Sequence, residues 1–326
     1  HAIGMGFPGH TFEDRFLIAD IRADLPFANE RHFHFDPPWN PGRQVLIHPQ
    51  PDGVWRIDWR VPSETDPDAE VADGRLDRRI RQVIGDGVAY ELIWLTTYHF
   101  SQRVADAFRD HRVLLAGDAA HVMSPFGARG LNSGVADAEN LAWKLAFILR
   151  GASPYALLDT YDAERRPAAL RNLAATNATM RFMAPHGRAR RVWRDLVLRM
   201  APRLAWFRRR VDSGRLAEPA HYPPSLIVAQ GPARGARPRH GRPAPDVALP
   251  AGGRLRDHLG RGYIALVPFE GDRPDDLARV VIGSETVYGA DRAWLVRPDG
   301  YLADSVPRAR LDALARPISA SGASSR

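Results

Sequence analysis

The sequence predicts a fold with both α+β and α/β character, and three observations predict it. Before residue 105, apolar and polar residues alternate in several short segments, which is typical of antiparallel strands with one buried face. Between Arg112 and Arg150, an apolar run, a glycine-containing loop and a long helical pattern follow one another. After residue 240, short apolar runs return and indicate a small separate α/β unit.

The first region predicts an antiparallel sheet. Its expected strands span residues 15–21, 32–35, 45–48, 54–61 and 90–100. The clearest is 54–61, where Trp55, Ile57 and Trp59 point to one face. The stretch 49–53 supplies hairpin turn residues before it. A helix is expected over 67–84, with Asp66 as its N-cap, and it would cover one face of the sheet.

The central region predicts a strand, a loop and a helix. The strand is expected over 113–116, and Asp118 follows at its tip. The helix should begin near Asn132 and end at Gly151. One apolar face is marked by Leu131, Val135, Ala138, Leu141, Ala142, Leu145, Ile148 and Leu149. Because the first amides of a helix lack partners within it, the loop and helix start form a ready polar site.

Composition narrows the classes of function. The 326-residue chain is 44% hydrophobic, and it has no cysteine, so disulfides, thiolate metal sites and cysteine nucleophiles are excluded. No metal site is predicted. No run of about 18 apolar residues occurs, so we expect no membrane span and a cytoplasmic protein.

The net charge is +7, and Lys144 is the single lysine among 45 basic residues. Arginines are densest between Arg181 and Arg215, where they alternate with apolar residues. These are Trp193, Leu196, Leu198, Met200, Leu204 and Trp206. The pattern suits amphipathic helices with a solvated basic face. We therefore expect neither a nucleic acid nor a membrane as partner. A nucleic-acid binder stays a minor alternative, and its affinity would fall steeply with salt.

The segment Gly117-Asp118-Ala119-Ala120-His121, then Pro125, then Gly127-Ala128-Arg129-Gly130-Leu131-Asn132 carries a resemblance. It resembles the second flavin-contacting motif of the FAD-dependent aromatic hydroxylases, single-component monooxygenases related to phenol, 3-(3-hydroxyphenyl)propionate and para-hydroxybenzoate hydroxylases. The resemblance implies that Asp118 hydrogen-bonds the ribityl chain of FAD and that Pro125 lies beside the isoalloxazine ring. It also implies that Gly127 belongs to the cofactor-binding residues and that the amides of Gly130, Leu131 and Asn132 face the pyrimidine end of that ring.

The same resemblance implies a reaction in which NAD(P)H reduces FAD and one oxygen atom of O2 is transferred to a small phenolic substrate. The antiparallel sheet would form the wall of the substrate pocket opposite the flavin. Candidates to orient a phenol are His48, Gln50, Tyr98 and His99, and Arg129 could balance negative charge. No residue is assigned as catalytic with certainty, and His121 is interpreted as a packing residue rather than a base. A homodimer is one possible assembly.

Three domains are expected. Residues 1–105 form a substrate-binding β-sheet domain, and 106–215 form the C-terminal part of an FAD-binding domain with connecting helices. Residues 216–326 contain a linker, a domain that resembles the thioredoxin-like C-terminal domain of the phenol-hydroxylase branch, and a disordered tail. A helix opening at Pro154 should end or kink at Pro167. Without cysteine, the C-terminal domain would have a structural or oligomer-contact role.

The motif expected for the ADP half of FAD is missing. Gly4, Gly6 and Gly9 match the spacing G-x-G-x-x-G, but no strand precedes them and Pro8 disrupts a following helix, so we interpret them as a turn. We therefore expect an N-terminally truncated enzyme fragment with impaired FAD binding and an incomplete FAD-binding domain. The alternative is a non-catalytic remnant or interaction module that holds no cofactor.

Overall fold

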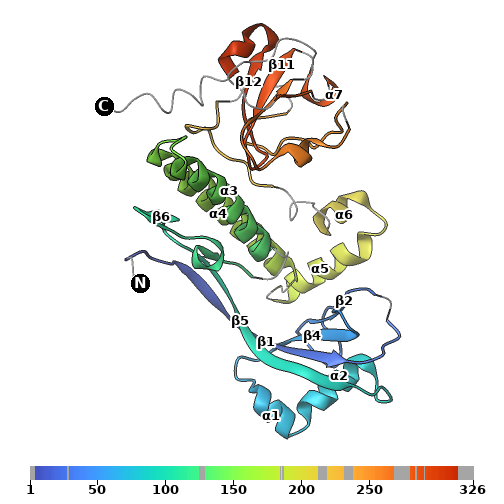
Figure 1. Cartoon of the computed structure of the whole chain (residues 1–326). Helices are drawn as coiled ribbons and strands as arrows, with labels where there is room; N and C mark the ends of the chain where they lie inside the picture. The colour runs from blue at the N-terminus through green and yellow to red at the C-terminus, as the bar shows by residue number, and fades with distance from the viewer. Residues whose placement is uncertain are drawn as a thin grey trace.

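The computed structural model describes residues 4–27, 29–124, 129–183, 185, 187–211, 219–230, 238–250, 252–267, 280–282, 285–289 and 291–314. Figure 1 shows the chain passing from a sheet with two covering helices, through a pair of long helices, to a smaller sheet at the opposite end. Pro125 and Gly127, both predicted to contact flavin, lie outside the described residues. No helix among the described residues is long and apolar enough to cross a membrane.

The N-terminal sheet has six strands in the order β2-β3-β4-β1-β5-β8, and every neighbouring pair is antiparallel. Its strands are β1 (Gly9–Arg22), β2 (His32–His34), β3 (Val45–Pro49), β4 (Val54–Val61), β5 (Glu91–Val104) and β8 (His121–Val122). β1 pairs with β5 from Gly9 onward, so the glycine-spaced segment leads into a strand and not into a helix.

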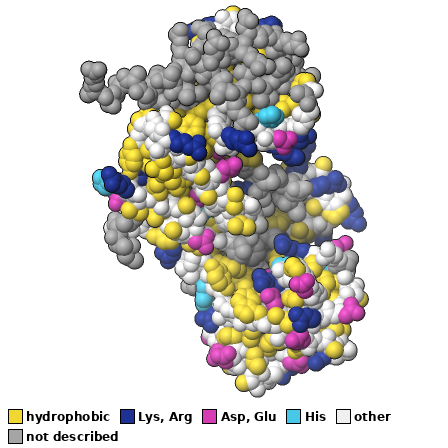
Figure 2. All heavy atoms as spheres, viewed as in Figure 1, with side chains coloured by type: hydrophobic (Ala, Val, Ile, Leu, Met, Phe, Trp, Pro, Cys, Tyr) yellow, Lys and Arg dark blue, Asp and Glu magenta, His cyan; other side chains and the backbone are white. Residues whose placement is uncertain are grey.

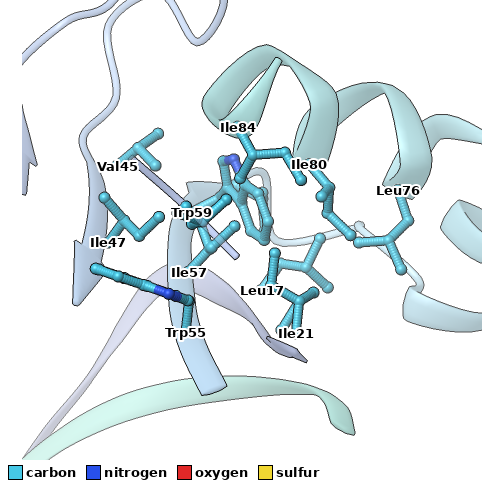
Figure 3. Close-up of a cluster of buried hydrophobic side chains, with 13 residues drawn as sticks. Leu17, Ile21, Val45, Ile47, Trp55, Ile57, Trp59, Leu76, Ile80 and Ile84 are labelled. Carbon is cyan, nitrogen blue, oxygen red and sulfur yellow. The ribbon is translucent and has the colours of Figure 1, made fainter. Parts of the chain in front are cut away.

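The core of this sheet lies on the face predicted by the alternation in 54–61. Trp55, Ile57 and Trp59 are buried there with Leu17 and Ile21 (Figure 3). Two helices cover this face, α1 (Pro67–Ala72) and α2 (Arg75–Ile84), where the sequence predicted one. The break occurs at Gly74, whose φ of +72° is left-handed and ends the first helix. Asp66 caps α1 as expected, accepting from the amide of Asp68 at 3.0 Å.

The central helices are α3 (Arg129–Leu149) and α4 (Asp159–Met183). The strand predicted over 113–116 is shorter: β7 (Val113–Leu114) pairs only with β6 (Arg109–Asp110). The sequence predicted that the second helix would end or kink at Pro167; the helix does not end there, because α4 continues to Met183. Ala168 and Ala169, which follow the proline, are buried, so packing compensates for the missing backbone hydrogen bond.

Helix α3 buries a polar face, whereas the face predicted to be apolar is exposed or only partly buried. Leu131 and Leu149, on the predicted apolar face, are 81% and 84% exposed. The buried face is polar and contains Ser133, Asp137, Asn140 and Lys144 besides Trp143. In Figure 2 a broad hydrophobic area accordingly lies at the surface over the central helices.

The remaining elements follow the long helices. Helices α5 (Arg188–Met200) and α6 (Ala205–Val211) precede a C-terminal sheet of order β10-β9-β11-β12. Its strands are β9 (Ile264–Val267), β10 (Val280–Ile282), β11 (Arg292–Val296) and β12 (Leu302–Pro307), with the short helix α7 (Glu285–Tyr288) between β10 and β11. β9 and β10 are parallel and the other pairs antiparallel. Among the described residues there are also four 3-10 turns: η1 (Gly117–Ala119), η2 (Tyr155–Leu158), η3 (Leu255–His258) and η4 (Arg308–Leu314).

Candidate functional site

The predicted flavin loop lies against the start of α3 because two glycines meet there. Gly117, at the beginning of η1, has a φ of +57°, a conformation that glycine adopts without strain. A Cβ atom added to Gly134 of α3 would lie 3.3 Å from the Cα atom of Gly117. Larger side chains would therefore push the loop away from the helix. Asp118, the next residue, is exposed.

Asp137 of α3 fixes this loop in place. Its Oδ2 atom accepts a hydrogen bond from the amide of Gly117 at 3.1 Å and lies 2.6 Å from Nε2 of His121. Both side chains of the Asp137–His121 pair are fully buried. Burial alone would raise the pKa of Asp137, but the hydrogen bond from His121 and the nearby Arg165 charge lower it below its ordinary value. The carboxylate is therefore charged and holds both ends of the loop that carries Asp118.

Helix α4 braces the same region from behind. Arg165 donates from Nε to Oδ1 of Asp137 at 2.7 Å and from Nη2 to the carbonyl oxygen of Ser133 at 3.3 Å. Its Nη1 atom donates to the Tyr222 hydroxyl at 3.0 Å. Arg129, which the sequence placed near flavin and substrate, is buried and donates to the side chain of Asn172. Its contact with Asn172 points to a structural role at the start of α3.

A second buried network joins α3 and α4 to the C-terminal sheet. Arg297 donates to Glu164 Oε1 at 2.6 Å and to Asp299 Oδ2 at 2.6 Å, and Lys144 donates to Glu164 Oε2 at 2.9 Å. Burial alone would raise the pKa of Glu164, but the charges of Arg297 and Lys144 lower it to about 2. Burial lowers the pKa of Lys144 to about 8, although Glu164 opposes that shift. Charged groups thus dock the C-terminal unit onto the central helices.

Sequence reasoning missed both networks, yet a signal for them was present. Ser133, Asp137, Asn140 and Lys144 follow one another at steps of three and four residues, the spacing of one helical face. A polar stripe with this spacing opposite an apolar one is ordinarily the solvent side of a helix. No sequence pattern links Arg297 to its partner Glu164, which lies 133 residues earlier in the chain.

The candidates for phenol binding lie on both faces of the N-terminal sheet. His48 of β3 and Tyr98 of β5 share the face opposite the helix-covered core, as the strand registers show. The Nε2 atom of Gln50 lies 2.9 Å from the imidazole Nδ1 atom of His48. His99 lies on the other face, where Arg15 donates to it at 2.9 Å. Because neighbouring residues of a strand point to opposite faces, Tyr98 and His99 do not line the same pocket.

Comparison with known proteins identifies the family. The model of the family described as "FAD binding domain" matches residues 1–176, which is more than half of the chain. The chain belongs to this family. Its relatives and structural neighbours are FAD-dependent aromatic monooxygenases, so the cofactor of the family is FAD.

Two curated relatives of this FAD-binding family show the range of similarity. A putative polyketide hydroxylase of Streptomyces coelicolor is 43% identical over 52% of this chain and 26% of its own length. A 12-dehydrotetracycline 5-monooxygenase/anhydrotetracycline 6-monooxygenase of Streptomyces rimosus is 31% identical over 92% of this chain and 62% of its own length. In four curated relatives, two polyketide hydroxylases and two 3-(3-hydroxy-phenyl)propionate/3-hydroxycinnamic acid hydroxylases, the chain spans between 26% and 33% of the relative's length.

A solved structure resembles nearly the whole chain. The rebeccamycin biosynthetic enzyme RebC with reduced flavin matches with a TM-score of 0.76 and 27% sequence identity, over 99% of this chain and 66% of that protein. The fold described above is therefore the fold of flavin-binding enzymes of this family. The family resemblance seen in the sequence is confirmed.

Proposed function

We propose that this chain provides the flavin-ring side of a site that hydroxylates a phenolic substrate, with NAD(P)H as reductant and O2 as the source of oxygen. The observation that carries the proposal is the arrangement of the Asp118 loop against the first turns of α3, fixed by Asp137. The names of the relatives, which include polyketide and tetracycline-type monooxygenases, support an aromatic substrate.

The residues present fit the cofactor. Asp118 is exposed, so its carboxylate is available to accept hydrogen bonds from the ribityl hydroxyls of FAD. A Cβ atom at Gly130 would meet no described heavy atom within 4 Å, so space is open at the start of α3. The first amides of α3, at Gly130 to Asn132, would face the pyrimidine end of the ring, where the helix dipole favours negative charge. FAD, when bound, supplies the electron transfer and oxygen activation that hydroxylation requires.

The sheet would supply the opposite wall. His48 and Tyr98 share the outer face of the sheet, and Gln50 orients the imidazole of His48, so this face offers hydrogen-bonding groups to a phenol. His48 also lies 3.8 Å from a carboxylate oxygen of Asp58. The proposed division is at 1–105 and 106–215, with a linker and a thioredoxin-like unit in 216–326. Strand β8 of the second part pairs with β5 across the first boundary, and the sheet order β10-β9-β11-β12 is compatible with a thioredoxin-like fold. The same proposal includes a homodimeric assembly.

A cofactor titration tests the site. Asp118→Ala should weaken FAD binding roughly ten- to hundredfold, because a charge-assisted hydrogen bond contributes about 1.5–3 kcal/mol. The dissociation constant is measured from the quenching of flavin fluorescence by the purified chain. Asp86→Ala, which removes another exposed carboxylate from the loop after α2, is the matched control and should leave FAD affinity unchanged. Equal affinity of Asp118→Ala and wild type would contradict the assigned role of Asp118.

A second candidate function is a module that holds no cofactor, and the exposed apolar face of α3 favours it. Leu131, the second residue after Arg129, is 81% exposed although it is one of the residues expected beside the flavin. Apolar surface of this kind normally has a covering partner. If the purified chain takes up no FAD at any concentration while remaining folded, this candidate replaces the enzymatic one. A stoichiometric flavin absorbance spectrum would exclude it.

A further inference from the structure

The two helices α5 and α6 concentrate positive charge. Residues 187–211 contain nine arginines against one acidic residue, Asp195. This short stretch therefore carries more net positive charge than the whole chain, which stands at +7. Arg188, Arg190, Arg191, Arg199, Arg203, Arg208 and Arg209 are exposed.

Apolar side chains emerge on the same helices. Val192, Trp193 and Trp206 are 68%, 44% and 54% exposed, and Leu196 and Leu204 are exposed as well. The sequence predicted amphipathic helices with a solvated basic face, so these residues were expected to point inward. The structure instead buries Arg194 and Val197. We call the exposed side chains of residues 188–209 the α5–α6 surface.

Ion pairing explains this orientation of α5. Arg194 donates to Asp36, in the segment between β2 and β3, at 2.8 Å, and its guanidinium lies 5.1 Å from the centre of the Phe35 ring. The helix is thus attached to the N-terminal sheet through an arginine, and the apolar residues are left on the outer side. Figure 2 shows Lys and Arg side chains with hydrophobic ones between them along the edge formed by these helices.

The aromatic rings of the α5–α6 surface support one another. The ring centres of Trp206 and Phe207 lie 4.7 Å apart, and the two rings meet edge to face. The ring centre of Trp193 lies 6.4 Å from that of Trp206 and 6.2 Å from that of Phe207. Edge-to-face packing is favourable and holds the rings in a fixed cluster. The surface is therefore a preformed apolar patch surrounded by arginines.

Charge and shape together select one class of partner. A second copy of this chain would bring two strongly positive surfaces together, and they would repel. Single-stranded nucleic acid would need open ring faces for stacking, whereas these rings pack against each other, and Val192, Leu196 and Leu204 offer no stacking surface. Interfacial helices on anionic membranes combine arginines with exposed Trp and Leu side chains, as this surface does.

We propose that the α5–α6 surface binds the interface of an anionic lipid membrane, with Trp193 and Trp206 at the level of the headgroups and the arginines beside lipid phosphates. This proposal differs from the expectation, drawn from the sequence, that the chain has no membrane partner. Neither helix crosses the bilayer: α5 has 13 residues and α6 has 7. The interaction does not depend on flavin, so it stands apart from the proposed function.

Vesicle sedimentation of the whole chain tests the proposal. The probes are vesicles of phosphatidylcholine with about 30 mol% phosphatidylglycerol and vesicles of phosphatidylcholine alone. The chain should bind the anionic vesicles at least about tenfold more tightly at low salt, and this preference should shrink as salt screens the charges. Brominated lipid should quench its tryptophan emission.

Two sets of variants separate charge from apolar contact. Arg190→Gln/Arg191→Gln/Arg209→Gln should weaken binding to the anionic vesicles roughly a hundredfold, at about fivefold per charge. Trp193→Ala/Trp206→Ala should also weaken binding and should abolish most of the quenching. The matched controls are Arg150→Gln/Arg261→Gln/Arg310→Gln, which removes three exposed arginines elsewhere, and Trp94→Ala, which removes an exposed tryptophan of β5. Both controls should bind like wild type.

Several results would overturn the proposal. These are no binding to anionic vesicles, equal binding to both vesicle types, or unchanged binding by the arginine variant. Tighter binding to a single-stranded oligonucleotide than to anionic vesicles would assign the surface to nucleic acid instead. A dimer in light scattering that the tryptophan variant disrupts would assign it to a second copy. Should the tryptophan variant fail to fold by circular dichroism, the arginine variant and its control decide the question.

Discussion

The N-terminal sheet and helix α3 bury side chains of opposite character. In the sheet, the apolar members of an alternating pattern face the core, as Trp55, Ile57 and Trp59 do. In α3, the apolar stripe faces outward and the buried stripe consists of polar and charged groups such as Asp137 and Lys144. The comparison teaches that periodicity identifies the two faces of an element, whereas the neighbouring groups decide which face is buried.

The energetic consequences of the two arrangements differ. An apolar core loses stability in proportion to the volume and area removed, and its neighbours partly relax around a change. A buried ionic network is stable only while every charge has its partner, since a charge left alone inside the protein is very costly. The two regions should therefore respond differently to single substitutions.

The largest effect is expected for Arg297→Met. The substitution leaves Glu164 and Asp299 buried near each other without their shared partner, and it should cost about 3–5 kcal/mol of unfolding free energy. Urea denaturation measures the change. Arg254→Gln breaks the exposed Arg254–Asp246 pair and should cost less than about 1 kcal/mol. Similar losses in both variants would show that the network is not the distinctive feature of this interface.

Ile57→Ala probes the apolar core of the sheet. Ile57 is fully buried between β1 and β3, and its truncation should cost about 2–5 kcal/mol through lost transfer energy and the cavity that remains. The same denaturation assay applies. Ile93→Ala, at a half-exposed position of β5, is the control and should cost much less. A cost for Ile57→Ala as small as the control would mean that the sheet core is loosely packed.

Acid should weaken the ionic network before it affects the apolar core. Glu164 has a folded pKa of about 2 and an ordinary value of 4.5, so its contribution is fully present above pH 4.5 and is lost as pH falls toward 2. The full contribution is at most about 3 kcal/mol, at 1.36 kcal/mol per pKa unit. Unfolding free energy measured between pH 5 and pH 3 should fall more steeply, by up to about 2 kcal/mol, in wild type than in Glu164→Gln, because pH 3 lies about 1.5 units below the ordinary pKa. The same dependence of unfolding free energy on pH in wild type and Glu164→Gln would refute the role assigned to Glu164.

The smallest effect is expected for the exposed face of α3. Leu131→Gln/Leu149→Gln should change the unfolding free energy by no more than about 0.5 kcal/mol, because both side chains already contact solvent. Ile80→Gln, on the buried face of α2, is the contrasting control and should be strongly destabilising. A large loss in the double α3 variant would show that this face is covered in solution.

Much of the N-terminal fold could be predicted from the sequence, because alternation over 54–61 and the turn residues before it determine strand and register locally. The division of the covering helix at Gly74 was missed because a single glycine inside a helical pattern is tolerated and need not end the helix. The reversed faces of α3 could not be predicted from periodicity. Their orientation depends on Arg165 and Arg297, which lie far along the chain.

For the candidate site, the sequence located the Asp118 loop and the start of α3, which lie side by side through Gly117 and Gly134. The assigned contacts to flavin stay predictions. The alternation of side chains along a strand is enough to separate Tyr98 from His99, since adjacent residues point to opposite faces. The groups that hold the loop, Asp137 and Arg165, were missed because polar residues in a helix usually face solvent.

Lys144, the single lysine of the chain, has a practical consequence. Its amine is fully buried and donates to Asn140 of α3 and Glu164 of α4, and Glu164 also pairs with Arg297 of the C-terminal unit. Of the amines in the sequence, an acylating reagent in solution can therefore reach only the N-terminal one while the C-terminal unit stays docked on the central helices. Acylation at Lys144 would then require the two parts to separate. The rate at which mass spectrometry detects that adduct would report how often this interface opens, without any introduced label.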